Sequence, residues 1–341
     1  MKHNPHRSII IWLLAGCFLI YVMVVIGGIT RLTHSGLSMV EWNPIIGSLP
    51  PMSDADWQVP FEKYKQSPEY QIINNQFTLE EFKSIYWWEY VHRLLGRTIG
   101  VVFLLPFFYF LFKKKFDKPF LKKMYVLLLL GAFQGVLGWF MVKSGLQKEP
   151  HVSHYRLAAH LISAFTVFGF TFWYAMDLLY PNELIRTEEV KKLNRWTKIA
   201  FVAIVLQIIY GAFVAGLKAG LFYNTYPTMG GELMPETVSS FDTFWQNCLE
   251  NPAGVQFLHR NIAIVVAVLV FFVWWKSSKM ALSSFQRRSA HFLLAVLCIQ
   301  FLLGIFTLLH AVPVTLGVLH QTGAFFLFAS GLFFLHSLRR A

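Results

Sequence analysis

Eight long apolar segments constrain the fold of this chain more than any other feature of its sequence. Each runs for about 18 residues or more with few charges, which is enough to cross the hydrocarbon core of a bilayer as a helix. In lipid, only helices and closed barrels satisfy their backbone hydrogen bonds, and these runs are too long and continuous for barrel strands. The expected fold class is all-α, a polytopic membrane protein with eight transmembrane helices. The expected spans are 9–29, 86–112, 124–143, 156–179, 197–217, 256–275, 289–309 and 314–337.

The net charge of +12 indicates how the chain is oriented in the membrane. With the N-terminus inside, the inner segments contain 19 of the 30 Lys and Arg residues and only 5 of the 18 Asp and Glu residues. An excess of Lys and Arg in cytoplasmic loops is the positive-inside pattern. We therefore predict that both termini are cytoplasmic. The basic charge reflects this topology and does not indicate a nucleic-acid partner.

The chain repeats itself once, at offsets of 160 to 184 residues. Each half contains four expected spans, an even number, so the two copies would run in the same direction across the membrane. We expect an N-terminal four-helix half, 1–181, and a C-terminal four-helix half, 182–341. The matched segments are 27–37 with 211–221, 88–103 with 255–270, 134–141 with 300–307, and 160–165 with 320–325.

The repeat singles out four of the twelve histidines. His92 corresponds to His259 and His160 to His320, all within about two turns of the expected outer ends of their spans. Two histidines at similar depth on different helices suit the axial ligands on opposite faces of one haem. A lone intramembrane histidine is more often a hydrogen-bonded packing residue. Zinc and copper sites usually have tighter clusters with cysteine or carboxylate, whereas these pairs are 68 and 61 residues apart.

A haem also needs an apolar slot between helices. The many Phe and Leu residues supply apolar surface, and small residues four apart allow helices to approach closely. We expect such contacts at Gly96 with Gly100 and at Gly131 with Gly135.

Charged residues beside His92 suggest that the two halves have different roles. Glu89 lies three residues before His92 on the same helical face, whereas its repeat partner is the neutral Gln256. Ionisable residues inside a membrane are usually functional, so we expect chemistry in the N-terminal half and a fixed cofactor in the C-terminal half. The alternative is a surface glutamate beside Arg93. Haem propionates or snorkelling to the interface would each account for Arg93, Arg97 and Arg260.

Several motifs resemble one known family over nearly the whole chain. They are EYVHR (89–93), HYRLAAH (154–160), FLHRN (257–261) and VLHQ (317–320), with GGITRLTHSGLSMVEWNP (27–44) and TYPTMGGELMP (225–235). The chain resembles the haem A synthase family, and within it the alphaproteobacterial and mitochondrial group. This resemblance implies oxidation of haem O to haem A for cytochrome c oxidase assembly. In this reaction, two successive hydroxylations of the C8 methyl group are followed by dehydration of the gem-diol to a formyl group.

The resemblance also implies roles for individual residues. His259 and His320 would be the axial ligands of a resident haem b, and His92 and His160 would contact the iron of the substrate haem O. Glu89 matches the acidic residue of the family and would accept a proton or position water. Some members carry a cysteine pair in their outer loops. This chain lacks such a pair in its first outer loop, so a thiol-based step is not carried over.

The resemblance further implies a multi-pass protein of the bacterial cell (inner) membrane, embedded in lipid. Expected partners are a haem O synthase (protohaem farnesyltransferase) and an electron donor, and a homo-oligomer is compatible with the sequence. The main alternative is a non-catalytic di-haem electron carrier resembling cytochrome b, which gives no reason for the difference between Glu89 and Gln256. A transporter would suit the parallel repeat, but the spans show no charged pairs at their centres.

Overall fold

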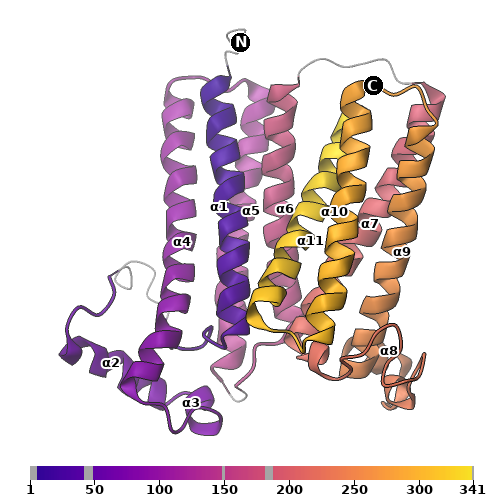
Figure 1. The fold of residues 1–341 in the computed structure, drawn as a ribbon. Coiled ribbons are helices and arrows are strands. Elements are labelled where there is room, and N and C mark those ends of the chain that lie inside the picture. The colour runs from indigo at the N-terminus through magenta and orange to yellow at the C-terminus, as the bar shows by residue number, and fades with distance from the viewer. Residues whose placement is uncertain (1–5, 42–48, 148–149, 181–186, 340–341) are drawn as a thin grey trace. The chain divides into compact units, whose positions relative to one another are not determined.

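The computed structural model describes residues 6–41, 49–147, 150–180 and 187–339, which are mainly helical (Figure 1). Every expected span falls on a long helix, so the all-α membrane fold is confirmed. Within these ranges there is no β-strand, only an isolated bridge between Met229 and Glu232. The eight helices long and apolar enough to cross a membrane are α1 (Arg7–Leu32), α4 (Leu79–Phe112), α5 (Lys118–Gly145), α6 (His154–Leu179), α7 (Glu188–Gly216), α9 (Pro252–Ser278), α10 (Ser284–Leu309) and α11 (Val314–Arg339).

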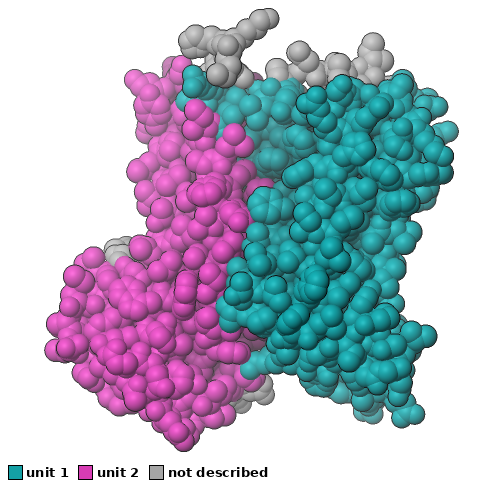
Figure 2. All heavy atoms as spheres, viewed as in Figure 1, with its two compact units in different colours: residues 1–10, 169–341 teal, residues 11–168 magenta. Residues whose placement is uncertain are grey.

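The chain divides into two compact units (Figure 2). Unit 2 comprises residues 11–168 and contains most of α1, with α4, α5 and the first part of α6. Unit 1 comprises residues 1–10 and 169–341 and contains the rest of α6, with α7, α9, α10 and α11. The expected boundary between residues 181 and 182 lies outside the described residues. The interpretation of the halves as parallel repeats stays a prediction.

Polar caps fix where the long helices begin. Thr78 caps α4 and Ser283 caps α10 in capping boxes, in which the cap side chain and the third helical residue satisfy each other's backbone N–H groups. Asp117 and Asn251 cap α5 and α9, and in both helices proline occupies the first turn, where its missing N–H costs nothing. These caps set the register of each helix and thereby the depth of its functional side chains.

α4 begins earlier than expected, and this changes the place of His92. The expected span starts at residue 86, but the cap at Thr78 starts the helix at Leu79. His92 therefore lies more than three turns into its helix, whereas His160, His259 and His320 lie within about two turns of theirs. The expectation that His92 lies within the first two turns is wrong as a statement about the helix, because α4 begins before the apolar stretch does.

The longer connections fold against the same ends of the helices that carry the histidines. In unit 2, α2 (Asp54–Lys65) and α3 (Pro68–Ile72) pack on the start of α4. Trp57 lies edge-on to Tyr86 at a centroid distance of 5.0 Å, within a buried aromatic cluster. In unit 1, the connection between α7 and α9 contains η2 (Ala219–Leu221), η3 (Glu236–Ser239) and α8 (Phe244–Leu249).

The glycines expected to mediate close helix contacts mostly do not. A Cβ added to Gly100, Gly131 or Gly135 would have no neighbour within 4 Å in the described part of the chain. Gly96 does face another helix, with Met23 Cε 3.4 Å from the Cβ position. Other glycines approach their neighbours more closely, and three of them, Gly138, Gly211 and Gly304, face histidine rings.

Candidate functional site

His259 on α9 and His320 on α11 face each other within unit 1. Their ring centroids are 6.5 Å apart, and the ring planes are nearly perpendicular at 83°. With metal–nitrogen bonds of about 2 Å on each side, two imidazoles flanking one metal ion have centroids roughly 6 Å apart. The spacing of this pair therefore suits two axial ligands of one haem iron.

Each of these two rings is held by a glycine and a glutamine of a neighbouring helix. A Cβ on Gly211 of α7 would lie 3.3 Å from His259 Cε1, and one on Gly304 of α10 would lie 2.9 Å from His320 Cε1. One helical turn before each glycine, a glutamine amide reaches the same ring. Gln207 Nε2 lies 3.1 Å from His259 Nδ1, and Gln300 Nε2 lies 3.2 Å from His320 Nδ1.

In unit 2, His160 on α6 has the same environment on α5. A Cβ on Gly138 would lie 3.1 Å from His160 Cε1. Gln134, one turn earlier, donates to the backbone oxygen of His160 at 3.1 Å and lies 3.4 Å from its Nε2. His160 Nδ1 is buried without a hydrogen-bond partner. One ring nitrogen is thus contacted by the amide and the other is left for a ligand.

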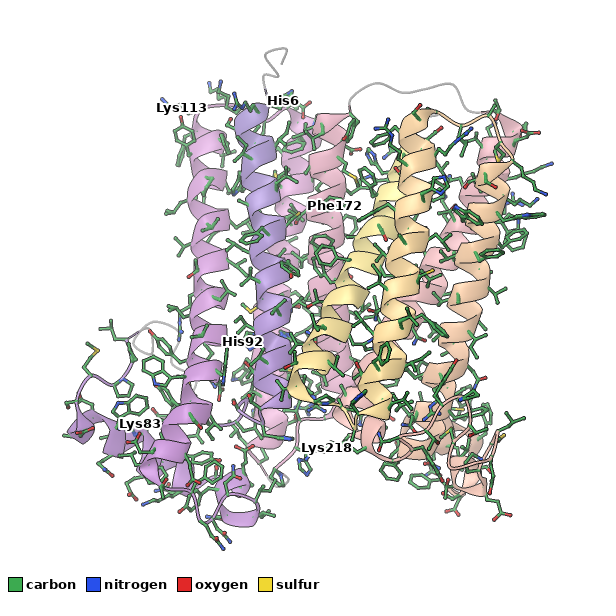
Figure 3. All side chains as sticks on the ribbon, viewed as in Figure 1. His6, Lys83, His92, Lys113, Phe172 and Lys218 are labelled. Atoms are coloured by element: carbon green, nitrogen blue, oxygen red, sulfur yellow. The ribbon has the colours of Figure 1, made fainter. Side chains whose placement is uncertain are left out.

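His92 is the fourth of the histidines expected from the sequence. It lies on the side of α4 that faces α1, where a Cβ on Gly27 would be 3.6 Å from its Cε1 (Figure 3). His92 and His160 thus lie in unit 2, whereas His259 and His320 lie in unit 1 and face each other.

The residues around the histidines fit a haem. The amide oxygens of Gln134, Gln207 and Gln300 are all buried without a partner. A histidine that binds iron through one nitrogen usually donates the N–H of the other to a fixed acceptor. If each amide group were rotated by half a turn about its terminal side-chain bond, its oxygen could accept the hydrogen bond from that N–H. Three or more His, Cys, Asp or Glu side chains grouped around one point, as a zinc or copper site would require, do not occur among the described residues.

Glu89 is buried, with 2% of its surface exposed, and both of its oxygens are engaged. Oε2 accepts hydrogen bonds from Ser38 Oγ and from the backbone N–H of Met39, each at 2.8 Å. Oε1 accepts from Arg93 Nη2 at 2.6 Å and from Arg93 Nε at 3.0 Å. The alternative interpretation of the sequence was a surface glutamate beside Arg93. Glu89 does pair with Arg93, but it is not a surface residue.

Arg93 and Arg260 hold backbone segments. Arg93 donates to the carbonyl oxygens of Met39 and Glu41, each at 2.7 Å. Arg260 donates to the carbonyl of Tyr223 at 2.7 Å, and also to those of Thr225 and Thr228. Each arginine thus fastens the segment that follows α1 or α7. Contacts with propionates stay a prediction, and the buried, unpartnered Nε of Arg260 offers one donor for them.

Gln256 has a simpler environment than Glu89. Its Nε2 donates to the carbonyl of Tyr223 at 3.1 Å, and its Oε1 is buried without a partner. The difference between Glu89 and Gln256 in the sequence is therefore accompanied by a difference in their contacts. Unit 2 places a carboxyl group with both oxygens hydrogen-bonded one turn before its histidine, and unit 1 places an amide there.

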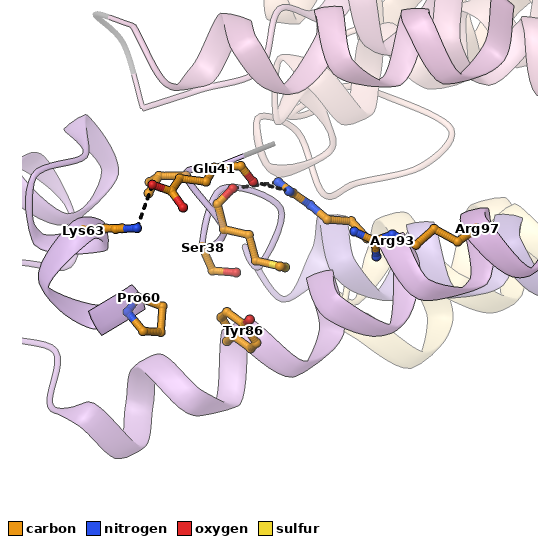
Figure 4. Close-up of a pocket in the computed structure, with 9 residues that line it drawn as sticks. Ser38, Glu41, Pro60, Lys63, Tyr86, Arg93 and Arg97 are labelled. Carbon is orange, nitrogen blue, oxygen red and sulfur yellow. Dashed lines mark hydrogen bonds and ion pairs between the residues drawn. The ribbon is translucent and has the colours of Figure 1, made fainter. Parts of the chain in front are cut away.

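A cavity of about 100 Å³ adjoins the residues that hold Glu89 (Figure 4). Ser38, Arg93 and Arg97 contribute to its lining, as do Tyr86 and the ion pair of Lys63 with Glu41. This volume is much smaller than a haem but is enough for a few water molecules, each of which needs about 30 Å³. Water can therefore reach the neighbourhood of the carboxylate from the connection between α1 and α4.

Several residues of the site were not identified from the sequence. The three glutamines, Ser38 and the four histidine-facing glycines were not selected as site residues. One signal was present, because the spacing Q-x-x-x-G occurs in both QGVLGWFM (134–141) and QFLLGIFT (300–307). The three cysteines, Cys17, Cys248 and Cys298, are free and lie on separate helices.

Eight apolar helices among the described residues, and a facing pair of histidines whose spacing suits haem, define a multi-pass membrane protein. The family model described as "Cytochrome oxidase assembly protein" matches residues 10–332. The chain belongs to this family.

Curated relatives are similar over almost their whole length, and their printed name is "Heme A synthase". The relative from Flavobacterium johnsoniae is 49% identical over 341 residues, covering 99% of each chain. The relative from Nitrosospira multiformis is 48% identical over 99% of this chain and 96% of its own. The relative from Paramagnetospirillum magneticum is 44% identical over 100% of this chain and 96% of its own.

Proposed function

We propose that this chain is a haem A synthase, an oxidoreductase that converts the C8 methyl group of haem O to the formyl group of haem A. Membership of the family supports the name, and the curated relatives carry it. The observation in the structure that carries the proposal is the buried carboxylate of Glu89 one turn before His92, where unit 1 has Gln256. An electron carrier has no need of this difference, whereas oxidation of a methyl group requires protons to be moved.

The two histidine pairs have different roles. His259 and His320 hold a resident haem b, and the fixed geometry of their rings in unit 1 supports that role. His92 and His160 receive the iron of haem O in unit 2. A bound haem supplies an iron that gives and takes single electrons. The residues of the chain orient it, exclude bulk water and manage protons.

Glu89 serves as the proton-handling group. Its carboxylate is held by Ser38, Met39 and Arg93 and is next to a cavity large enough for water. A carboxylate that is positioned and buried in this way can accept a proton and pass it to water, with typical rate contributions of about 100-fold to 10,000-fold. Arg93 supplies the opposite charge beside it.

The protein acts in the bacterial cell membrane with both termini in the cytoplasm, as the distribution of Lys and Arg supports. The histidine-bearing ends of the helices then face outward. A haem O synthase, which makes the farnesylated substrate, is the expected supplier, and a membrane electron donor is needed. Reporter fusions at the two ends of the chain test this orientation.

The deciding experiment identifies the haems that the protein makes. The chain is produced in a membrane that contains haem O but no other haem A synthase, and its haems are extracted and identified by mass. Haem A from the native protein, with haem O or a hydroxylated intermediate from Glu89→Gln, is the expected result. Haem b alone from both proteins would contradict the proposal and favour the electron carrier.

A matched control tests whether the carboxylate must lie in unit 2. Gln256→Glu introduces the same carboxylate at the equivalent position in unit 1, where Arg260 follows at the same spacing of four residues. This variant is expected not to restore haem A production when combined with Glu89→Gln. Restoration would place the chemistry in unit 1 instead.

A further inference from the structure

Three of the four histidines share an anchor that the fourth lacks. The rings of His160, His259 and His320 each contact a glutamine that lies four residues before a glycine on the neighbouring helix. One turn of helix separates the two positions, so the amide and the glycine lie on the same helical face. The pairs are Gln134 with Gly138, Gln207 with Gly211, and Gln300 with Gly304.

At His92 the corresponding residue is a methionine. Gly27 of α1 faces the ring, and four residues earlier the sequence has Met23. The side chain of Met23 reaches α4, where its Cε lies 3.4 Å from the Cβ position of Gly96. Its thioether sulfur is at best a weak hydrogen-bond acceptor. The ring of His92 forms no hydrogen bond with the described residues.

The glycine contact at His92 is also the loosest of the four. The Cβ positions of Gly304, Gly138 and Gly211 lie 2.9, 3.1 and 3.3 Å from the ring they face, so these rings lie directly against a helix backbone. At Gly27 the distance is 3.6 Å, an ordinary van der Waals separation. His92 thus lacks both the contact with a glutamine amide and the close contact with a glycine that restrict the other rings.

We propose that Met23 makes His92 the exchangeable ligand of the substrate haem, while Gln134 holds His160 as the permanent one. The inference rests on the proposed function and deepens it, because an iron held by two histidines would gain an open coordination position only when one of them leaves. An outer hydrogen bond fixes the orientation and the tautomer of a ligating histidine, and its loss typically weakens metal binding by about 10-fold to 100-fold. Met23 is therefore a positioning residue, which acts through His92.

The same reasoning assigns the opposite property to unit 1. Both of its histidines contact a glutamine, and Gln300 is packed so closely against Gly323 that a Cβ there would collide with the amide oxygen. Neither ring is free to swing away. A haem held by this pair keeps both ligands, as a resident electron-transfer cofactor requires.

Carbon monoxide binding tests the proposal without relying on turnover. Carbon monoxide binds ferrous haem only where a coordination position is open or opens readily. In the purified, haem-loaded native protein, we expect it to bind the haem of unit 2 and not that of unit 1. Met23→Gln should slow its association by about 10-fold or more, because the new amide anchors His92 as in the other sites. Met23→Leu keeps the bulk without an acceptor and should retain the native association rate.

The reverse substitution guards against a misfolded variant. Gln207→Met removes an anchor in unit 1 and should make the resident haem reactive toward carbon monoxide, with haem content measured in parallel. Equal association rates in Met23→Gln and Met23→Leu, or an unreactive resident haem in a fully loaded Gln207→Met, would overturn the inference. Failure of the native protein to form haem A would instead overturn the proposed function, and the Gln207→Met result would still test the anchor.

Discussion

Arg93 holds Glu89 from one turn further along α4, with Nη2 2.6 Å and Nε 3.0 Å from the same carboxylate oxygen. The side chains of the pair are 11% and 3% exposed, so little solvent screens it. The same arginine reaches the carbonyls of Met39 and Glu41. One ion pair therefore orients the proposed proton-handling group and fastens the segment after α1.

This ion pair predicts a specific pattern of stability. Arg93→Met leaves the Glu89 carboxylate buried without an opposite charge, which typically costs about 3–5 kcal/mol. Combining it with Glu89→Gln removes the uncompensated charge, so the double variant should be more stable than Arg93→Met alone. Thermal unfolding in detergent measures the difference. A double variant less stable than Arg93→Met would contradict the role assigned to the pair.

The histidine pairs predict which haem each variant loses. His259→Ala or His320→Ala should remove the resident haem b, seen in the reduced-minus-oxidised absorption spectrum. His92→Ala or His160→Ala should keep that spectrum and yield no haem A. His310→Ala, which changes an exposed histidine at the end of α10, is the control and should resemble the native protein. Loss of haem b from the His160 variant would argue against the division between units.

The glycines predict a graded series. An added methyl group would collide most with the ring at Gly304, less at Gly138 and Gly211, and least at Gly27, following distances of 2.9, 3.1, 3.3 and 3.6 Å. Within unit 1, Gly304→Ala should therefore lower haem content more than Gly211→Ala. In unit 2, Gly138→Ala should be more harmful than Gly27→Ala. Gly135→Ala is the control, since its added carbon meets no neighbour. The measurement is haem content per protein. A reversed order in either unit would contradict the role assigned to the glycines that face the histidine rings.

The connection between α1 and α4 depends on its aromatic core. Trp57 is 7% exposed and packs against Phe82 and Tyr86. Trp57→Ala should destabilise the packing of α2 on α4 by about 3–5 kcal/mol, the usual cost of removing a large buried aromatic side chain. Limited proteolysis should then cut α2 faster while the membrane helices remain intact. Val59→Ala, at a 57% exposed position of the same helix, should not change the cleavage rate.

The sequence by itself determined the fold class and the histidine pairs. A run of apolar residues long enough to span a bilayer has few alternatives to a helix, because lipid offers its backbone no hydrogen-bond partners. Every expected span therefore coincides with a helix. Comparison of the two halves then separated His92, His160, His259 and His320 from the other histidines. It also marked the difference between Glu89 and Gln256, because the two positions match in the sequence repeat.

Only the tertiary structure decided what each of these residues contacts. The depth of His92 in α4 depends on a cap at Thr78, outside the apolar run. The bonds of Glu89 to Ser38 and Met39 join residues about fifty positions apart, and no local pattern specifies them. The glycine that faces each histidine, and the glutamine that contacts three of them, lie on a different helix, so their role appears only when the helices pack. Local propensity and hydropathy fix a helix, whereas the partners of its polar side chains are set by long-range packing.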